Sequence, residues 1–512
     1  MKDNLHLGTT AREKIISGIR KCRDAVGGTM GTGGSNALIQ AMENPGHLTT
    51  NDGATILESI RFQDPLEEMG RKILLEAVSR ANKQSGDGSS TTTVLTAAII
   101  EEGLAHLKEA SAMEIKRALE ACIPVIERSI DAQKRTITTE EVGAVAAISA
   151  EDSAIGDLLQ EIYQEIGPKG IVYWDISKTA DDSYKIGKGI TIEGAGFASP
   201  YFCDANEQGF SNVARLKNPV VLLTKQKITT AGDFEKLFGQ LNAEGKKEVL
   251  LFCDEIDQVA VTQLVQTRLV RGFRTVAVKM PTFWKDWWYE DLAKATGATV
   301  IDPVAGLSHA NMTTQHLGTI ADVVVTKEDT FLDGIQDVTA HVAVLEESGT
   351  DEGKVRAARL STRTARYFVG AHSESALSYR RLKVEDAINA AYHALNGGVC
   401  AGGGVALKNA SLELDGDDVG TRILKTALRA PMRQIMANAG IVEGEIPNEI
   451  TANGYDTRTG TIVDMFDAHI TDPAVIVTNA AKNAISVAAA VLTTNLVITL
   501  PIEHGGQTVQ PM

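Results

Sequence analysis

Apolar residues recur every three or four positions over long stretches near both ends of the chain, the spacing that places them on one face of a helix. One such face contains Ile15, Ile16, Ile19, Cys22 and Val26. The same spacing predicts helices over residues 12–30, 64–84, 91–109 and 112–131. We therefore expect the two ends of the chain to be mainly helical.

The middle of the chain has a different pattern. Between Gly189 and Gly370, short apolar runs alternate with helical stretches, as is typical of an α/β fold. The predicted strands cover residues 220–223, 249–252, 276–278 and 322–325. The sequence thus predicts a multidomain α and α/β protein, with a mainly helical part from both ends and an α/β part inserted between them.

The most unusual stretch covers residues 86–93, where Asp87 lies between two glycines and five hydroxyl residues follow. The helical spacing around it predicts a tight turn that opens a helix. Exposed N–H groups and the positive end of the helix dipole favour an anion there, and glycine lets the backbone approach a phosphate. Asp87 would repel phosphate, but it can hold a bridging Mg²⁺. The alternative is an Asp-Gly turn with ordinary Ser/Thr capping.

The overall composition is that of a globular protein, with 43% hydrophobic and 23% charged residues among 512. A formal net charge of −16 argues against nucleic-acid and anionic-membrane partners. The five cysteines have no paired spacing, so we expect buried thiols in a reducing compartment. We find no secretory signal and no apolar run long enough to span a bilayer, and we expect a cytoplasmic location.

Two further turns accompany the Asp87 stretch, at residues 29–34 and at Asn51-Asp52-Gly53. Together the three turns resemble the nucleotide-binding elements of the group I chaperonins, the GroEL family. Further matches follow in the family's order, at residues 147–150, 199–202, 384–387, 401–407 and 472–473. Only the sequence of residues 50–57 is closer to that of the group II members. The chain is identified as a divergent relative of the group I family, of viral or distant bacterial origin.

The resemblance implies a chaperonin architecture with three domains. Residues 1–132 and 397–512 would form an equatorial ATP-binding domain, residues 133–188 and 371–396 an intermediate hinge domain, and residues 189–370 an α/β apical domain. It also implies a homo-oligomeric ring of seven subunits that binds unfolded polypeptides and uses ATP and Mg²⁺, with K⁺ as a further candidate. Participation of a co-chaperonin is left open.

The family match assigns ATP binding to residues of the three turns and of later motifs. These are Thr29, Met30, Gly31, Asn51, Gly53, Asp87, Gly88, Ser89, Ser90, Thr91, Ile148, Gly403, Asp456, Thr457 and Asp472, with Asp87 also the metal ligand. Two departures affect the assignment. Thr32-Gly33-Gly34 replaces the family's Pro-Lys-Gly, so the turn is less preset, and Asp456 replaces an Asn, so an amide donor is lost. We expect weaker nucleotide binding and altered adenine recognition.

Two carboxylates, Asp52 and Asp386, are the catalytic candidates that would act on the attacking water. Asp52 lies in the Asn-Asp-Gly turn, whereas Asp386 lies in a later helix that resembles the catalytic helix of the intermediate domain. A carboxylate carried by a hinged domain would couple closure to hydrolysis. The alternative for Asp386 is a solvated helix residue near Lys383 and Glu385.

Polypeptide binding is expected from apolar side chains of the predicted apical domain. An aromatic loop would contribute Phe197, Tyr201 and Phe202, and two helices would contribute Phe234, Leu237, Phe238, Leu241, Val261, Leu264 and Val265. Both helical sets have i, i+3, i+4 spacing, which suits a buried core stripe or a partly exposed groove. The family match favours the groove.

These expectations define an ATP-dependent ring chaperonin that captures non-native polypeptides. Two alternatives stay open. A chaperonin-like ring scaffold would have weak or no ATPase activity. A small-molecule kinase or ATPase would instead enclose a polar pocket within residues 190–370.

Overall fold

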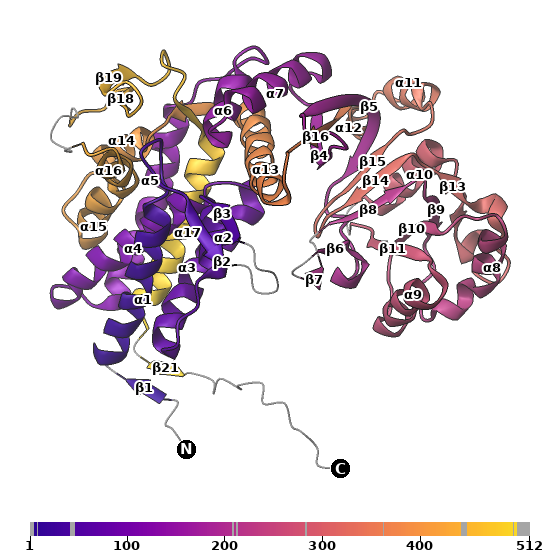
Figure 1. Ribbon diagram of the computed structural model, residues 1–512, viewed down its shortest axis with the longest axis horizontal. Coiled ribbons are helices and arrows are strands. Elements are labelled where there is room, and N and C mark those ends of the chain that lie inside the picture. Colours follow the sequence, from indigo (N-terminus) through magenta and orange to yellow (C-terminus); the bar gives the residue numbers. More distant parts are fainter. Residues whose placement is uncertain are drawn as a thin grey trace. The chain divides into compact units, whose positions relative to one another are not determined.

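The computed structural model describes residues 5–7, 9–40, 47–206, 209–210, 213–281, 284–361, 363–441, 448–494 and 496–498. The chain divides into two compact units (Figure 1). Unit 1 comprises Met1–Pro168, Trp174–Ser183 and Phe368–Met512, and unit 2 comprises Lys169–Tyr173 and Tyr184–Tyr367. Both chain ends thus belong to one unit around an inserted middle, as the sequence predicts. The finer division into three domains stays a prediction.

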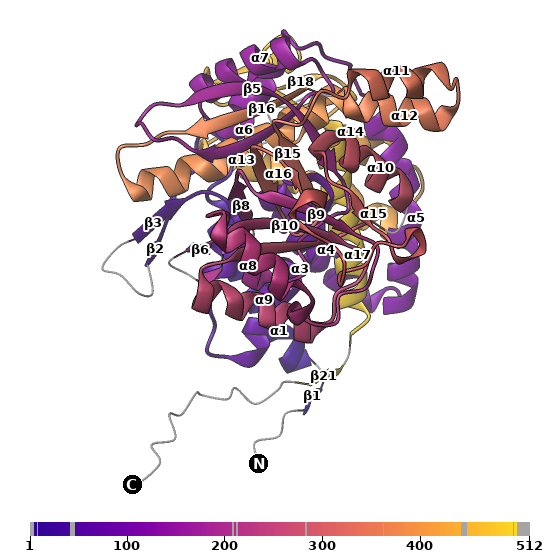
Figure 2. The same ribbon diagram turned by 90° about the vertical axis from the view of Figure 1, so that its right-hand side faces the viewer.

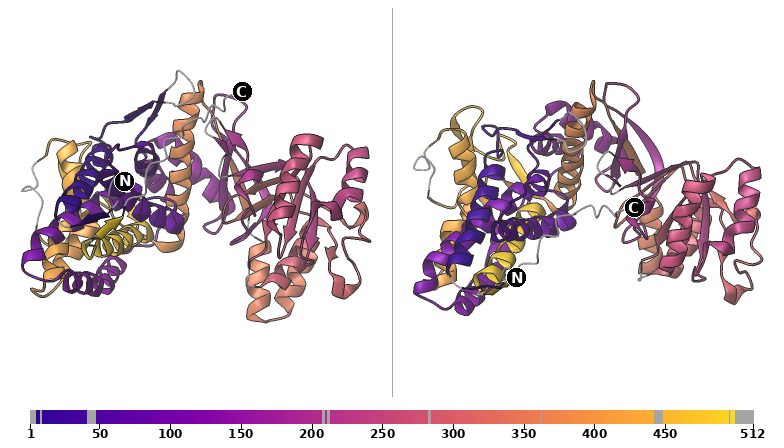
Figure 3. Two further views of the ribbon diagram at one scale, coloured as in Figure 1. Left: turned by 90° about the horizontal axis from the view of Figure 1, so that it is seen from below. Right: turned by 60° about the horizontal axis from the view of Figure 1, so that its bottom comes forward.

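Unit 1 is built around α17 (Ala474–Leu492), which lies among helices from both ends of the chain (Figure 3). It packs against α3 (Pro65–Ser85), α4 (Ser89–Ala105) and α5 (Ala112–Ala132). By length and composition α17 could cross a membrane, with a mean hydropathy of 1.6 over its most apolar window. However, 61% of that window is buried inside the protein, so α17 is a core helix.

Local signals in the sequence explain where the long helices of unit 1 begin. The side chain of Asp64 caps α3, and Pro65 occupies the first turn, where no backbone donor is needed. α5 begins with a capping box between Ser111 and Glu114. The other elements of unit 1 are β1 (Leu5–Leu7), α1 (Thr9–Gly27), β2 (Ala37–Gln40), β3 (His47–Thr50), α2 (Gly53–Ser59), α6 (Val142–Ala150), α7 (Ser153–Ile166), α13 (Glu374–Gly397), β17 (Val399–Ala401), α14 (Val405–Glu413), α15 (Val419–Ala427), α16 (Ala430–Asn438), β18 (Asn453–Asp456), β19 (Thr461–Asp464), β20 (Thr471–Pro473) and β21 (Leu496–Ile498).

The described residues of unit 2 form two larger sheets and one two-stranded sheet. The first is mainly parallel and has the strand order β11 (Arg274–Lys279), β10 (Glu248–Cys253), β9 (Val220–Thr224) and β12 (Val300–Ile301), with β13 (Gly318–Thr319) antiparallel to β9. The second has the order β4 (Ile171–Ile176), β16 (Arg363–Val369), β5 (Ser183–Ile192), β15 (Thr330–Asp333), β14 (Asp322–Val325) and β8 (Ala214–Lys217). All five residues of β9 are buried, as expected for a central parallel strand.

Helices accompany the parallel strands of unit 2. α9 (Gln258–Arg271) packs against β11, and α8 (Glu235–Ala243) contributes side chains to the same core. Figure 2 shows α11 (Thr339–Glu347) beside α12 (Asp351–Leu360), and the two helices are in contact. The remaining elements are α10 (Lys285–Thr296) and the short strands β6 (Ala205–Asn206) and β7 (Gly209–Phe210). The α/β pattern predicted for the middle of the chain is therefore confirmed.

The apolar stripes of α8 and α9 correct one sequence prediction. Seven of the side chains proposed for polypeptide binding lie in the core of unit 2: Phe202, Phe234, Leu237, Phe238, Leu241, Val261 and Leu264. Phe197 and Val265 are partly buried against the same core. The expected groove is wrong for the seven buried side chains, because the parallel strands need apolar cover and these helices supply it.

The five cysteines, at positions 22, 122, 203, 253 and 400, are all free and buried. The prediction of unpaired, buried thiols is confirmed. Burial raises the pKa of each thiol, most strongly at Cys400, so the thiols are poor nucleophiles.

Candidate functional site

The turn between α3 and α4 requires its two glycines. Gly86 and Gly88 have φ angles of 65° and 92°, in the region that residues with a side chain rarely adopt. A Cβ on Gly86 would also lie 2.3 Å from Nδ2 of Asn389. α4 begins directly afterwards at Ser89, and its first N–H groups have no partner within the helix. The turn therefore presents backbone donors and the positive end of a helix dipole.

The Asn-Asp-Gly turn lies against the first turn of α4. Asp52 caps α2, and its Oδ2 accepts a hydrogen bond of 2.7 Å from the Thr55 backbone. Its Oδ1 accepts a hydrogen bond of 3.1 Å from Oγ of Ser89. A Cβ on Gly53 would lie 2.8 Å from Oγ of Ser90, so this position has no space for a side chain. Two of the sequence-predicted turns thus form one surface.

α6 and α13 complete this surface from other parts of the chain. Ser149 of α6 donates to Oδ2 of Asp87 at 3.2 Å. Asn389 of α13 donates to the carbonyl oxygen of Gly86 at 3.1 Å. Because Asn389 follows Asp386 by three residues on the same helix, the two share a face. α13 thereby brings Asp386 to the turn that holds Asp87.

Burial, with a smaller contribution from neighbouring carboxylates, raises the pKa values of Asp87, Asp386 and Asp472. Burial raises the pKa of Asp87 against the hydrogen bonds from Gly88 and Ser149, and the charge of Asp52 adds to the rise. Burial also raises the pKa of Asp386 well above its ordinary value, followed by the charges of Asp87 and Asp52. The pKa of Asp472 rises to about 6, through burial and then the charge of Asp87. Such a concentration of carboxylates favours a bound cation.

The donor set fits a magnesium ion that is shared with phosphate oxygens. Asp87 accepts one hydrogen bond on each carboxylate oxygen, from Gly88 and from Ser149, which leaves lone pairs on both oxygens for a metal. Among the residues described, no cluster of three or more metal-ligating side chains is preassembled. Mg²⁺ at nucleotide sites is commonly held by one or two carboxylates together with phosphates and water, so the donors present are sufficient.

Three residues that the sequence analysis did not assign to the site connect its parts: Lys383, Glu151 and Ser149. Nζ of Lys383 donates to Oε1 of Glu151 at 3.1 Å, and Nδ2 of Asn51 donates to the same oxygen at 2.8 Å. Ser149 holds Asp87, as described above. Each lies within or directly beside a family-like motif, 147–150 or 384–387. That adjacency is the signal that could have identified them.

The first glycine-rich turn is held by α16. Nδ2 of Asn438 donates to the carbonyl oxygens of Gly27 and Met30, both at 2.8 Å. A Cβ on Gly34 would lie 2.4 Å from backbone atoms of Thr29. Hydrogen bonds and close packing therefore fix this turn without the family's proline. The weaker nucleotide binding expected from that loss stays a prediction.

The C-terminal residues lie beside these turns. β17 pairs with β20, which places Cys400 opposite Asp472, and a Cβ on Gly402 would lie 3.3 Å from Oδ1 of Asp472. Gly403 has a φ of 62°. Oγ1 of Thr457 hydrogen-bonds to Oγ1 of Thr32 in the first turn. The other residues assigned to nucleotide binding lie in these same elements. The first turn contains Met30 and Gly31, α4 contains Thr91, and α6 contains Ile148.

The carboxylate of Asp456 accepts hydrogen bonds within its own turn. Its Oδ1 accepts hydrogen bonds from the backbone N of Arg458 at 2.9 Å and from the Arg458 guanidinium at 3.3 Å. Burial raises the pKa of Asp456, but these hydrogen bonds outweigh burial and lower it below its ordinary value. The carboxylate is thus an ionised acceptor that is already engaged, which leaves the adenine contact assigned to it without geometric support.

A pH-dependent stability follows from Asp472. Its pKa is about 6 in the folded chain against an ordinary 3.8, so the folded state binds more protons between these values and loses stability as pH rises through them. In nucleotide-free protein, Asp472→Asn should therefore raise the melting temperature at pH 7 but change it little at pH 4. The expected gain at pH 7 is on the order of 2–3 kcal/mol. An equal gain at both pH values would contradict the assignment.

Comparisons with known proteins agree with this geometry. Two solved structures of the chaperonin gp146 from the bacteriophage EL 2 (Pseudomonas aeruginosa), both in the presence of ATP-BeFx, share 20% sequence identity with this chain. Crystal form II has a TM-score of 0.72 and covers 96% of this chain and 98% of that chain. Crystal form I has a TM-score of 0.64 and covers 98% and 100%. The predicted chaperonin fold is confirmed.

The sequence profile of the TCP-1/cpn60 chaperonin family matches residues 23–166 and 209–500. These ranges contain the three glycine-rich turns, the segment with Ser149, and the helix with Asp386. Because the match extends over most of the chain, the chain belongs to the TCP-1/cpn60 chaperonin family.

Proposed function

We propose that this protein is an ATP-dependent, ring-forming chaperonin that captures non-native polypeptides and assists their folding. The observation that supports ATP hydrolysis best is the meeting of Asp52, Asp87 and Asp386 at the N-terminus of α4. Asp52 caps α2, Asp87 lies in the 86–88 turn and Asp386 lies on α13. Ser89 donates to Asp52, Ser149 donates to Asp87, and Asn389 holds the turn through the carbonyl oxygen of Gly86. A phosphate chain and its cation fit such a site.

Each residue of the site has a distinct proposed role. The backbone of residues 86–91 would bind phosphate oxygens, and Asp87 would hold Mg²⁺, which when bound neutralises phosphate charge. Burial and neighbouring carboxylates raise the pKa of Asp386 in the ligand-free site, which favours its protonated form. Once a cation neutralises Asp87, Asp386 ionises more readily and can accept a proton from water. Asp52, already bonded to Ser89 and Thr55, would orient that water.

The structure suggests a different surface for polypeptide binding from the stripes that the sequence favoured. Tyr201, Leu269 and Val270 are exposed, and Val265 is partly buried against the core. Arg268 of α9 donates to the carbonyl oxygen of Cys203 at 3.2 Å, which joins the end of α9 to the loop that carries Tyr201. We name Tyr201, Val265, Leu269 and Val270 the apical patch, and propose that it contacts clients, because apolar side chains that gather on an exposed surface commonly mark an interaction site.

The function is tested by two measurements on the purified full-length chain. Steady-state ATP hydrolysis should require Mg²⁺ and stop in EDTA, and electron microscopy should show closed rings, for which we expect seven subunits. A monomer that hydrolyses ATP would contradict the ring. Rings without Mg²⁺-dependent hydrolysis would contradict the ATPase. We expect the protein to act in the cytoplasm. The hydrolysis assay should also be run with and without K⁺, the further candidate cation.

One observation favours a second candidate, a ring scaffold with little or no ATPase activity. Asp456 stands where the family's Asn would recognise the base, and its carboxylate is engaged by Arg458. Asp456→Asn distinguishes the two candidates. A scaffold should gain nucleotide affinity in this variant from a very low starting level, whereas an active ATPase should change its affinity only a few-fold.

A further inference from the structure

Two hydrogen-bonded contacts, which we name the anchors of α13, lie on either side of Asp386. Lys383 forms one anchor and lies three residues before Asp386, and Asn389 forms the other and lies three residues after it. Residues three apart in a helix lie on neighbouring turns of one face. The three side chains therefore form a row along α13, with the catalytic candidate in the middle.

The anchor at Asn389 acts on the backbone beside the proposed metal ligand. Its Nδ2 donates to the carbonyl oxygen of Gly86 at 3.1 Å. That carbonyl belongs to the planar peptide group that joins Gly86 to Asp87, so the bond fixes the orientation of the backbone from which the Asp87 side chain extends. The contact is close, since a Cβ on Gly86 would not fit beside Asn389. A shift of α13 at this point would therefore also disturb the metal ligand.

The anchor at Lys383 leads to the turn that contains Asp52. Lys383 is buried, and a buried ammonium group needs a partner of opposite charge. Its Nζ donates to Oε1 of Glu151 at 3.1 Å, and Nδ2 of Asn51 donates to the same oxygen at 2.8 Å. Asn51 directly precedes Asp52. One carboxylate oxygen thus connects α13 with the Asn-Asp-Gly turn.

The backbone of Glu151 is unusual for a residue with a side chain. Glu151 is the C-cap of α6 and has a φ of 56°, in the left-handed region that glycine prefers. Residues in such conformations persist where tertiary contacts hold them, and they are frequent at functional sites. α6 also packs against α13 and holds Asp87 through Ser149. α6 therefore contacts both the proposed metal ligand and, through Glu151, the helix that carries Asp386.

We propose that Asn389 and Glu151 are positioning residues that hold the carboxylate of Asp386 in place for ATP hydrolysis. Each acts through α13, and neither is assigned a contact with nucleotide or water. Anchors on both sides of Asp386 restrain rotation of the helix as well as its displacement. The carboxylate needs such control, because a misplacement of about 1 Å can slow a reaction by about 10²-fold. This inference rests on the ATPase activity proposed above.

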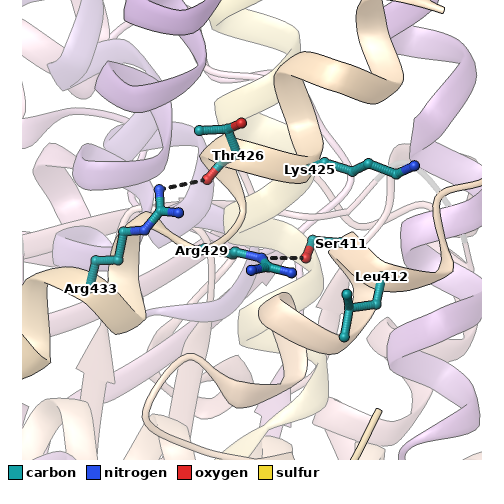
Figure 4. Close-up of a pocket in the computed structure, with 6 residues that line it drawn as sticks. All are labelled: Ser411, Leu412, Lys425, Thr426, Arg429 and Arg433. Atoms are coloured by element: carbon teal, nitrogen blue, oxygen red, sulfur yellow. Dashed lines mark hydrogen bonds between the residues drawn. The ribbon is translucent and has the colours of Figure 1, made fainter. Parts of the chain in front are cut away.

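A pocket of about 350 Å³ between α14, α15 and α16 takes no part in this arrangement (Figure 4). Figure 4 shows hydrogen bonds from Arg429 to Ser411 and from Arg433 to Thr426 at this pocket. Among the described residues, its lining includes none from α6, α13 or the 86–88 turn. Substitutions at the two anchors therefore leave this pocket unchanged.

Steady-state hydrolysis of Mg²⁺-ATP by full-length variants tests the proposal. Asn389→Ala and Glu151→Ala should each lower kcat by about 10–100-fold. KM should stay within about threefold of the wild type, because the two residues place the carboxylate that acts on water and do not bind nucleotide. The matched controls are Asn396→Ala on α13 and Glu161→Ala on α7, which remove the same groups from exposed positions. Both controls should keep the wild-type kcat.

Hydrogen exchange of the backbone gives a second measurement, which does not depend on activity. Peptides that cover residues 85–91 should exchange faster in Asn389→Ala than in the wild type, because the peptide group between Gly86 and Asp87 loses its anchor. Asn396→Ala should exchange like the wild type over the same residues. Equal exchange in all three proteins would show that Asn389 does not hold the turn, and would overturn its positioning role.

Two kinetic results would also overturn the proposal. The first is a wild-type kcat in Asn389→Ala and Glu151→Ala. The second is a rise in KM as large as the fall in kcat, since the two residues would then serve nucleotide binding. A wild type without Mg²⁺-dependent hydrolysis is a different outcome, because it contradicts the ATPase function itself and, with it, any positioning role in hydrolysis.

Discussion

Replacing Asp386 by asparagine is expected to slow ATP turnover by about 10²–10⁴-fold, the usual contribution of a general base. The affinity for nucleotide should stay within a few-fold of the wild type, because Asp386 is proposed to act on water and not on phosphate. Burial and the charge of Asp87 raise the pKa of Asp386 in the ligand-free site, so a cation bound beside Asp87 should favour the ionised form of Asp386. Single-turnover hydrolysis and equilibrium nucleotide binding separate the two effects.

Two variants serve as controls for this experiment. Glu385→Gln removes a charge from the adjacent, exposed position of α13 and should leave turnover near the wild-type rate. Asp87→Ala should weaken Mg²⁺-nucleotide binding itself, because its carboxylate is the proposed metal ligand. The assignment of roles is wrong if Asp386→Asn and Asp87→Ala lose nucleotide affinity equally.

The elements of unit 1 could be predicted from local patterns. The helix predicted over 112–131 is α5 at Ala112–Ala132, and the one predicted over 64–84 is α3 at Pro65–Ser85. In both cases a capping residue and a regular apolar spacing act within one segment. The Asp87 turn was predictable for the same reason, since its glycines and the helix that follows form a local signal.

The connections between the motifs were not predictable in the same way. The hydrogen bonds from Lys383 to Glu151 and from Asn389 to Gly86 join residues 232 and 303 positions apart. No periodicity links such residues, because their proximity is created by the path of the whole chain. The resemblance to a family predicted that the motifs meet, and only the structure shows which side chains connect them.

The apolar stripes of unit 2 show what helical periodicity alone does not predict. The spacing of Phe234, Leu237, Phe238 and Leu241 identifies one face of α8 correctly, but spacing does not tell what that face contacts. In the structure this face of α8 packs into the core, against a sheet whose central strand is buried throughout. The exposed apolar side chains of α9 include Leu269 and Val270, which lie near the end of the helix and outside the predicted stripe.

This arrangement provides a matched pair of leucines on one helix. Leu264 is 1% exposed and Leu269 is 81% exposed, so the same change to alanine tests the core at one position and the apical patch at the other. Leu264→Ala should destabilise the folded state by about 2–5 kcal/mol, through lost burial and the cavity left behind. Leu269→Ala should change stability by less than about 0.5 kcal/mol, as surface substitutions usually do. Thermal or denaturant melts of the full-length variants measure both values.

The effects of the two changes on the capture of an unfolded client should have the reverse order of their effects on stability. Leu269→Ala, alone and combined with Tyr201→Ser, should reduce the fraction of a chemically denatured test protein that the chaperonin keeps from aggregating. Leu264→Ala should retain capture at temperatures below its lowered melting point, because its side chain does not reach the surface. If Leu264→Ala abolishes capture while still folded, and Leu269→Ala with Tyr201→Ser does not, then clients bind where the buried stripes open and the apical patch is not their site.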